Sequence, residues 1–285
     1  MMKAALNKTL RKLGNIATLQ RRVHALAVME RERYVKDLLM SPRYESELSV
    51  TRRGFKVYSQ YDEDGIIQEI FSRIGMTSRR FVEFGVEEGL ENNTLKLLLE
   101  GWEGLWLEAS SAYVNQMRRT FDNVIQAGRL RIKQAFVDRD NINNLIGEFY
   151  EGEIDLLSID IDGNDIHVFD AIRIIQPRVV VIEYNGKFPP PLSIAQAYNP
   201  GHRWRATDYG GASLSAIAKV AEAKNYKLVG CNITGVNAFL VRGDLVNGRF
   251  LAPYTAEQHY EPARYFLWGT FVSGHPPDWG DYVAI

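Results

Sequence analysis

Cysteine is almost absent from the sequence, and its absence restricts both the chemistry and the compartment. The chain of 285 residues contains one cysteine, Cys231. A single cysteine excludes an intramolecular disulfide and a cysteine-rich zinc site. The composition therefore predicts a protein of a reducing compartment, and a cytoplasmic location is the default expectation.

Long hydrophobic runs are also lacking. No apolar run approaches the roughly 20 residues that a membrane-spanning helix needs, and the opening MMKAALNKTLRKLG has no continuous hydrophobic signal region. We therefore expect neither a membrane span nor secretion through a signal peptide. The content of 46% hydrophobic and 24% charged residues is that of a globular protein and excludes disordered and fibrous classes.

Acidic residues are missing from residues 1–29. Residues 1–58 hold 13 Lys and Arg against 5 Asp and Glu, a net charge of +8 in a chain whose total is −1. Apolar residues recur there every three or four positions, which predicts a basic amphipathic helix. The apolar positions are Leu6, Leu10, Leu13, Ile16, Leu19, Val23 and Leu26, and the basic positions are Lys3, Lys8, Arg11, Lys12, Arg21 and Arg22.

Three interpretations of this helix compete. It could oligomerise or dock on a core, it could anchor the protein on anionic lipid, or it could be a mitochondrial-type presequence. We favour the first interpretation, which makes a homo-oligomer an expected form, and keep peripheral membrane contact as an alternative. The acidic remainder of the chain argues against a nucleic-acid partner, because phosphate binding needs basic residues near the active site.

Short β-branched runs alternate with segments of helical period from residue 62 onward, which is typical of a parallel sheet with crossover helices. The last two runs are separated by TGV alone, too short for a crossover, so they must pair antiparallel. We therefore predict a Rossmann-like α/β fold of the class I S-adenosylmethionine (SAM) dependent methyltransferase type, in which a terminal hairpin completes a seven-stranded sheet. The predicted strands are 80–85, 104–109, 131–137, 154–161, 178–184, 226–233 and 237–242.

The dinucleotide signature GxGxxG is absent from the turn after the first strand. That turn reads FVEFGVEEG, in which Glu83, Gly85 and Gly89 form ExGxxxG. A dinucleotide would place its pyrophosphate here, where the carboxylates of Glu83, Glu87 and Glu88 would repel it. SAM offers a sulfonium cation and an ammonium group instead. The acids therefore favour SAM over NAD, although a tight turn with solvated acids would have the same sequence.

Acidic residues also end the second and third strands. Glu108 lies 23 positions beyond Gly85 after the apolar run GLWL, where an acid would accept hydrogen bonds from the ribose hydroxyls of an adenosine ligand. Asp138 ends the third strand and could accept from the adenine amino group. Capping of the helix that begins near Asn141 is an equal alternative for Asp138.

Five segments together resemble one known family. FVEFGVEEG, DLLSIDIDGND and VVVIEYN, with SQYDEDG before them and NAFLVRGDL after them, are similar to the FkbM-type SAM-dependent O-methyltransferases over roughly residues 57–242. The resemblance implies a class I fold, SAM as methyl donor, and hydroxyl acceptors on sugars or secondary metabolites. It also implies that Gln60 lies over the methionine part of SAM, and we assign Asn93 to the cofactor site. The family commonly has Glu two positions after the strand-four Asp, where this chain has Asp162.

The ends of strands four and five carry a set of oxygen ligands. Asp160, Asp162 and Asp165 follow strand four, and Glu183 and Asn185 follow strand five. We predict Asp160, Glu183 and Asn185 as a candidate Mg²⁺ site, because hard oxygen ligands suit that ion, and a similar arrangement occurs in catechol-type and macrolide-sugar O-methyltransferases. Alternatively, Asp160 contacts the sulfonium side of SAM without metal, Asp165 caps a helix and Glu183 binds the acceptor.

A general base is needed to deprotonate a hydroxyl acceptor. His202 lies in the long segment 185–211, within NPGHRWRATDYGG, which should cover the acceptor site. We predict His202, Asp160 and Asp162 as catalytic residues, while a purely structural His202 is the alternative. The neighbouring Trp204 and Tyr209 would suit a sugar ring, but a lid packed for stability would look the same.

These observations predict a helical extension (1–56), a methyltransferase domain (57–242) and an aromatic-rich tail packed on it (243–285). The predicted function is SAM-dependent transfer of a methyl group to a hydroxyl of a sugar, glycan or secondary metabolite. Two alternatives remain open: an NAD(P)-dependent oxidoreductase or sugar-nucleotide enzyme, and a noncatalytic SAM-binding protein.

Overall fold

A computed structural model describes residues 2–267 and 274–285, with side chains from residue 16 onward. The side chains of the predicted apolar positions Leu6, Leu10 and Leu13, and of the basic positions Lys3, Lys8, Arg11 and Lys12, therefore lie outside the described residues. The chain divides into two compact units, Met1–Ser46 and Glu47–Ile285. Residues 47–56, which the sequence assigned to the extension, lie in the second unit.

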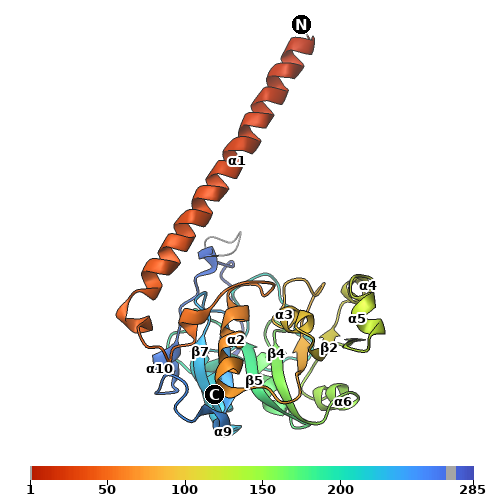
Figure 1. Ribbon diagram of the computed structural model, residues 1–285, viewed down its shortest axis with the longest axis vertical. Helices are drawn as coiled ribbons and strands as arrows, with labels where there is room; N and C mark the ends of the chain where they lie inside the picture. The colour runs from red at the N-terminus through yellow and green to blue at the C-terminus, as the bar shows by residue number, and fades with distance from the viewer. Residues whose placement is uncertain (1, 268–273) are drawn as a thin grey trace. The chain divides into compact units, whose positions relative to one another are not determined.

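The first unit is dominated by one helix (Figure 1). Helix α1 runs from Met2 to Leu39 and is followed by the 3₁₀ turn η1, Pro42–Tyr44. The helix thus continues past the acid-free stretch into a segment of mixed charge, where Arg33 bonds Glu30 at 2.7 Å. No helix in the described part of the chain is long and apolar enough to cross a membrane.

The second unit is built on a seven-stranded sheet in the order β3-β2-β1-β4-β5-β8-β7. Strands β1 to β5 are mutually parallel, whereas β8 runs antiparallel to both β5 and β7. This order and the antiparallel hairpin are those of the class I methyltransferase fold, so the predicted fold is confirmed. The strands are β1 Arg80–Phe84, β2 Glu103–Glu108, β3 Leu130–Gln134, β4 Gly152–Ile159, β5 Ile175–Glu183, β7 Tyr226–Cys231 and β8 Asn237–Arg242.

Helices cover both faces of this sheet, because its buried strands are apolar on both sides. Along β1 and β4 successive residues alternate between two cores: Phe81 and Leu156 pack with α2, α3 and α4, and Val82 and Leu157 pack with α6, α7 and α8. The elements outside the sheet are η2 Thr51–Arg53, α2 Glu63–Ile74, α3 Leu95–Leu99, α4 Ser111–Thr120, α5 Asp122–Gln126, α6 Ile142–Gly147, α7 Asp165–Ala171, α8 Leu214–Ala223, α9 Gly243–Val246, α10 Ala256–His259 and η3 Tyr265–Leu267.

A second, two-stranded sheet was not predicted. Strand β6, Ile194–Gln196, lies inside the segment expected as a long loop and pairs antiparallel with β9, Tyr282–Ala284, from the tail. The carbonyl of Ile285 accepts hydrogen bonds from Ser193 Oγ and Lys219 Nζ. The tail is therefore fastened to the segment that carries His202.

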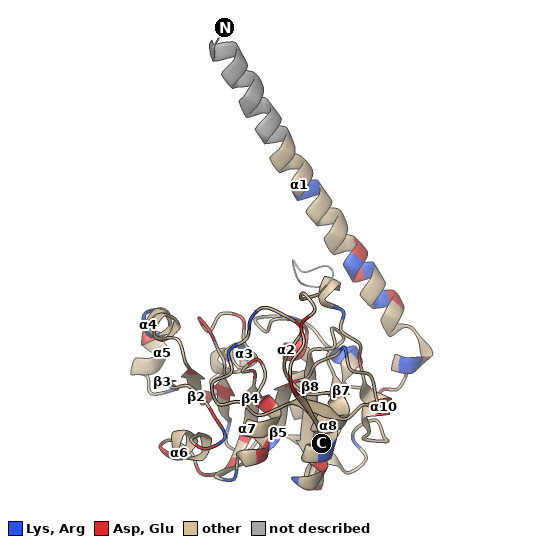
Figure 2. Ribbon diagram, turned by 180° about the vertical axis from the view of Figure 1, so that it is seen from behind, with Lys and Arg blue, Asp and Glu red and all other residues tan. Residues whose placement is uncertain are grey.

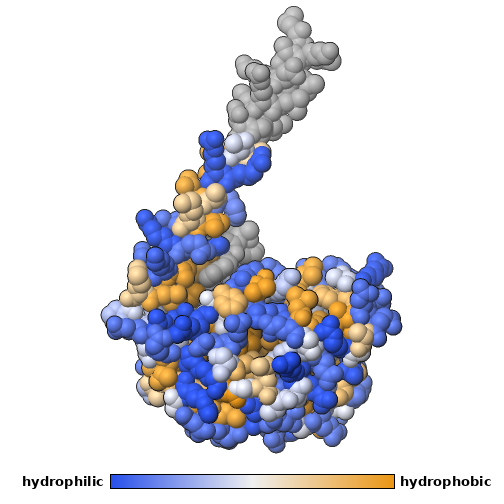
Figure 3. All heavy atoms as spheres, in the orientation of Figure 1, coloured by the Kyte–Doolittle hydropathy of each residue, from blue (hydrophilic) through white to orange (hydrophobic). Residues whose placement is uncertain are grey.

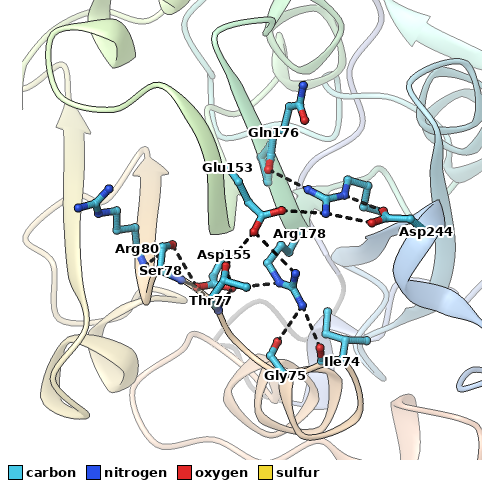
Figure 4. Close-up of polar contacts among 12 residues, drawn as sticks. Ile74, Gly75, Thr77, Ser78, Arg80, Glu153, Asp155, Gln176, Arg178 and Asp244 are labelled. Atoms are coloured by element: carbon cyan, nitrogen blue, oxygen red, sulfur yellow. Dashed lines mark hydrogen bonds and ion pairs between the residues drawn. The ribbon is translucent and has the colours of Figure 1, made fainter.

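A network of acids and arginines closes the edge of the sheet where β4 and β5 begin (Figure 4). Asp155 is fully buried and accepts hydrogen bonds from the backbone N–H groups of residues 77–79. Arg178 Nε lies 3.2 Å from Asp155 Oδ1, and Arg242 bonds Glu153 at 2.8 Å. These contacts fix the approach to β1 and leave the opposite edge of the sheet for the site.

Candidate functional site

The turn after β1 brings the backbone of Gly85 against the end of β4. Gly85 adopts φ +70°, and a Cβ at this position would lie 1.6 Å from the carbonyl oxygen of Asp160. Gly89 adopts φ +76°, with Trp106 where its Cβ would be. Both glycines are therefore required by the conformation and the close packing of this turn.

Glu83, at the end of β1, is buried and holds the segment that follows the turn. Its carboxylate accepts hydrogen bonds from the backbone N–H of Asn93 at 2.9 Å and from the hydroxyl of Thr94 at 2.5 Å. Burial raises the pKa of Glu83 to about 7, although these hydrogen bonds act in the opposite direction. Asn93 Nδ2 donates to Ser158 Oγ at 3.0 Å and ties the segment to β4. Glu83 and Asn93, both predicted to bind the cofactor, thus hold the segment after the turn in place through these hydrogen bonds.

Glu108 ends β2 beside the same turn and is 7% exposed. Its two carboxylate oxygens accept hydrogen bonds from the backbone N–H groups of Glu87 at 3.0 Å and Ser110 at 2.7 Å. Each oxygen keeps a further lone pair, because a carboxylate can accept about four hydrogen bonds. A ligand with two neighbouring hydroxyls could use this remaining capacity.

Two other predicted cofactor residues lie in local turns. The Asp138 carboxylate accepts hydrogen bonds from the backbone N–H groups of Asp140 and Asn141, each at 2.8 Å, in the turn before α6, whose N-cap is Asn141 rather than Asp138. Gln60 is exposed, and its backbone carbonyl oxygen accepts a hydrogen bond from Lys56 Nζ. The structure therefore gives Asp138 a turn-forming contact and places the Gln60 side chain at the surface.

Carboxylates gather where β4 and β5 end. Asp160 follows β4, Asp165 begins α7 and Glu183 ends β5, and one oxygen from each lies within 4.8 Å of the others. Burial raises the pKa values of Asp160 and Glu183 well above their ordinary range, and repulsion from the neighbouring carboxylates raises them further. Within the described residues neither of these two carboxylates receives a hydrogen bond. They form an acidic surface suited to a cationic ligand.

Asp162 lies at the rim of this cluster in a left-handed conformation with φ 57°. Burial, followed by the charge of Asp165, raises the pKa of Asp162 to about 6. Its backbone carbonyl, rather than its side chain, contacts the next predicted catalytic residue, His202.

The acidic cluster contains two of the three predicted metal ligands, Asp160 and Glu183, together with Asp165. The two carboxylate oxygens of Asp165 already accept hydrogen bonds from the backbone N–H groups of Ile161 and Gly163. Asn185 instead directs Nδ2 to the carbonyl oxygens of Asp208 and Gly210, and its Oδ1 accepts from Lys187 N. Asn185 therefore fastens the 208–210 turn, because its amide satisfies backbone groups of its own loop.

His202 packs over Gly163 and donates from Nε2 to the carbonyl oxygen of Asp162 at 3.0 Å. Because a carbonyl only accepts, Nε2 carries the proton and Nδ1 is the nitrogen that could accept one. Burial lowers the pKa of His202, so the ring is neutral near pH 7. His202 thus lies beside the acidic cluster, and its hydrogen bond to the Asp162 carbonyl oxygen also holds its loop against the turn after β4.

Tyr61 was missed by the sequence analysis. Its pKa is raised by burial and then by the charges of Glu63, Glu183 and Asp160, which places its hydroxyl in the environment of the acidic cluster. Tyr61 lies in the motif SQYDEDG, from which the resemblance indicates Gln60 as the residue near SAM. Asp64 of the same motif accepts the backbone N–H groups of residues 57–59 and so shapes the segment that presents Tyr61.

The comparison with protein families agrees with this architecture. Residues 106–194 match the model described as "Methyltransferase FkbM domain". This match confirms the resemblance to the FkbM family and covers strands β2 to β6. No curated protein matches the chain.

The chain has some similarity to solved structures of methyltransferases. An O-methyltransferase from Bacillus cereus in complex with S-adenosylhomocysteine (SAH) is 14% identical over 75% of this chain and 88% of its own, with a TM-score of 0.40. The N-terminal domain of EvdMO1 with SAH and D-fucose is 14% identical over 75% of this chain and 95% of its own, with a TM-score of 0.41. The methyltransferase domain of bacterial CtHen1-C is 15% identical over 65% of this chain and 98% of its own, with a TM-score of 0.42.

Proposed function

Because residues 106–194 match the FkbM methyltransferase domain, we propose that the protein transfers a methyl group from SAM to a hydroxyl group of a sugar, glycan or secondary metabolite. The observation that carries the proposal is the acidic cluster of Asp160, Asp165 and Glu183 beside the glycine turn. SAM brings a sulfonium cation and an ammonium group, whose charges complement this cluster.

The proposed donor site runs from β2 to β4. Glu108 accepts hydrogen bonds from the two ribose hydroxyls, because its carboxylate is held by two backbone N–H groups and keeps acceptor capacity. Gly85 allows the cofactor to approach the backbone, and Asp160 faces the positive end of the cofactor. Glu83 and Asn93 act as positioning residues through Thr94 and Ser158.

The reaction is an in-line displacement at the methyl carbon. The acceptor oxygen forms a bond to that carbon, the carbon–sulfur bond breaks with its electron pair going to sulfur, and the products are an ether and SAH. The hydroxyl proton passes to a base, for which we propose His202 through Nδ1, with Asp162 at the rim as the neighbouring acid. Aromatic faces of Trp204 and Tyr209, the latter 6.2 Å from the His202 ring, would suit a sugar ring.

A divalent cation remains a separate part of the proposal. The oxygens of Asp160, Asp165 and Glu183 would hold it, and when bound it would lower the pKa of the acceptor hydroxyl. Asn185, the third predicted ligand, would add its Oδ1, which accepts one hydrogen bond from Lys187 N at 3.2 Å and keeps a further lone pair. Methyl transfer that is undiminished in excess EDTA would remove the cation from the reaction.

The decisive experiment is isothermal titration of the protein with SAM and SAH. We expect micromolar binding of both, and a loss of roughly ten- to hundredfold in affinity for Glu108→Ala, because two charge-assisted hydrogen bonds disappear. Glu151→Ala is the matched control, since Glu151 is an exposed acid at the opposite edge of the sheet. Absence of binding, or equal affinities for the two variants, would sink the cofactor assignment.

An acceptor screen then separates enzyme from binding protein. Incubation with methyl-labelled SAM and a panel of sugars and glycans should label a hydroxyl-bearing acceptor. SAM binding without labelling of any acceptor would favour a noncatalytic SAM-binding protein. Thermal stabilisation by NAD in place of SAM would revive the oxidoreductase alternative.

A further inference from the structure

Helix α1 carries an exposed apolar stripe that the proposed methyltransferase chemistry does not use. Among its described side chains, Ile16, Leu19, Val23 and Leu26 are between 54% and 65% exposed. Their spacing of three and four residues places them on one face of the helix. Figure 3 shows hydrophobic and hydrophilic residues side by side on the described part of this helix. A stripe of this kind requires a covering partner.

The charge of the same segment selects the partner. Residues 2–29 contain six Lys and Arg and no acid, and the first acid of the helix is Glu30. On the coloured part of α1 in Figure 2 the acidic residues lie toward the C-terminal end of the helix. A helix with an apolar stripe, a net positive charge and no acids in this segment complements a surface that is both apolar and anionic, which is the chemistry of an anionic lipid bilayer.

A second copy of the helix fits less well. Continuing the three-four spacing of the stripe leads to positions 30 and 33, where Glu30 and Arg33 bond each other at 2.7 Å. Toward the N-terminus the spacing of three or four residues continues through Leu13, Leu10 and Leu6, but at 100° per residue these positions turn away from the face of Ile16, Leu19, Val23 and Leu26. One face therefore stays apolar only from Ile16 to Leu26, about one and a half heptads, whereas a coiled coil needs apolar positions sustained over at least three to four. This limit argues against the oligomerising interpretation that the sequence pattern favoured.

We propose that the 16–29 segment of α1 binds the surface of an anionic lipid bilayer, lying in its plane. Ile16, Leu19, Val23 and Leu26 enter the boundary between headgroups and acyl chains. Arg22 lies beside this face and pairs with lipid phosphates, and Arg21 on the opposite face adds its charge to the attraction between the helix and the anionic surface. The proposal does not depend on the methyltransferase assignment, because it rests on the first unit of the chain alone.

Vesicle co-sedimentation of the full chain tests the proposal. We expect binding to vesicles of equal parts phosphatidylglycerol and phosphatidylcholine, little binding to phosphatidylcholine alone, and weaker binding at high salt. Arg21→Gln with Arg22→Gln should weaken the binding about thirtyfold, because each cation near an anionic surface contributes about fivefold. Leu19→Gln with Leu26→Gln should also release the protein.

The control variant is Arg33→Gln with Lys36→Gln, which removes the same charge from the mixed-charge part of the helix and should keep most of the affinity. Circular dichroism and SAH titration of each variant check that the helix and the second unit are intact. An absence of vesicle binding overturns the proposal, as does equal weakening by the control pair. Dimerisation abolished by the two leucine substitutions would assign the stripe to a second copy, and stronger binding to duplex DNA would assign it to nucleic acid.

Discussion

The two ends of β4 carry the same kind of side chain in opposite electrostatic settings. Near its start, burial works to raise the pKa of Glu153, but hydrogen bonds from Arg242 and Thr77 outweigh it and the pKa is lowered. Just past its end, the pKa of Asp160 is raised by burial and by neighbouring carboxylates. Arginines thus pair with the acids where β4 begins, whereas the carboxylates where β4 ends face one another, at the place where a cation is expected to bind.

The comparison separates stability from function. At the closed edge each acid is satisfied within the protein, so it contributes to holding β1, β4 and β5 together. At the open edge the mutual repulsion of Asp160, Asp165 and Glu183 costs free energy in the ligand-free protein. A bound cation would relieve that repulsion, which is how an unfavourable arrangement in the free protein becomes affinity for a ligand.

Removal of an acid from the closed edge should have the largest effect. Asp155→Ala leaves the backbone N–H groups of residues 77–79 without their acceptor and removes the buried carboxylate beside Arg178, which keeps its hydrogen bond to the carbonyl oxygen of Ile74. We expect a loss of about 3–5 kcal/mol in the free energy of unfolding. Urea denaturation measures it. Glu151→Ala, an exposed acid near the same edge, should stay within about 0.5 kcal/mol. A loss below about 1 kcal/mol for Asp155→Ala would contradict the structural role of this network.

A substitution at the contact between the glycine turn and the end of β4 should cause the second largest loss of stability. Gly85→Ala and Gly128→Ala both place alanine at a positive φ, of +70° and +73°, but only at Gly85 does the added Cβ meet backbone, the carbonyl of Asp160. We therefore expect Gly85→Ala to cost about 1–3 kcal/mol more than Gly128→Ala in urea denaturation. Equal losses would mean that the close approach of the two turns is absent in solution.

Neutralising an acid where β4 ends should change the free energy of unfolding less, and should increase it rather than decrease it. Asp160→Asn removes one charge from the cluster without changing the size of the side chain, and we expect a gain of about 0.5–2 kcal/mol in the stability of the ligand-free protein. The same variant should bind SAM more weakly. If Asp160→Asn destabilises the ligand-free protein as Asp155→Ala does, then the two ends of β4 do not differ as described.

The smallest effect concerns pH. The raised pKa values of Asp160, Asp162 and Glu183 mean that these groups take up protons at higher pH than usual, at about 6 for Asp162. A cationic ligand favours their charged forms, so SAM affinity should rise with pH from 5 to 8 and fall as the carboxylates are protonated. The slope should not exceed about tenfold per pH unit for each proton released. SAH lacks the sulfonium charge, so its titration should show a weaker pH dependence; identical profiles would remove the cluster from the sulfonium side.

The sheet was predictable because its strands are written in local patterns. All seven predicted strands occur, with ends displaced by at most a few residues, and the TGV spacer correctly indicated the antiparallel hairpin. Strand β6 was missed because three residues show no period, and its partner β9 lies far along the chain. Pairing between distant short segments leaves no trace in a local window.

The site was predictable in position but less so in detail. The acids after β4 and β5 were expected at one edge because parallel strands end together, and the structure brings Asp160 and Glu183 to each other. The sequence does not show that Asp165 and Asn185 both also bond backbone groups of their own loops. These contacts depend on how the loops fold, as does the burial of Tyr61 next to the exposed Gln60.

The small sheet of β6 and β9 has a consequence for how specificity could diversify. The proposed donor side is built from residues at the ends of the large sheet, whereas the segment carrying His202, Trp204 and Tyr209 is fastened by β9 and by the carbonyl of Ile285. Substitutions in this fastening could therefore reshape the acceptor side while leaving the glycine turn and Glu108 unchanged. Under the proposed function, donor binding and acceptor binding would therefore depend on separate parts of the chain, which could vary independently.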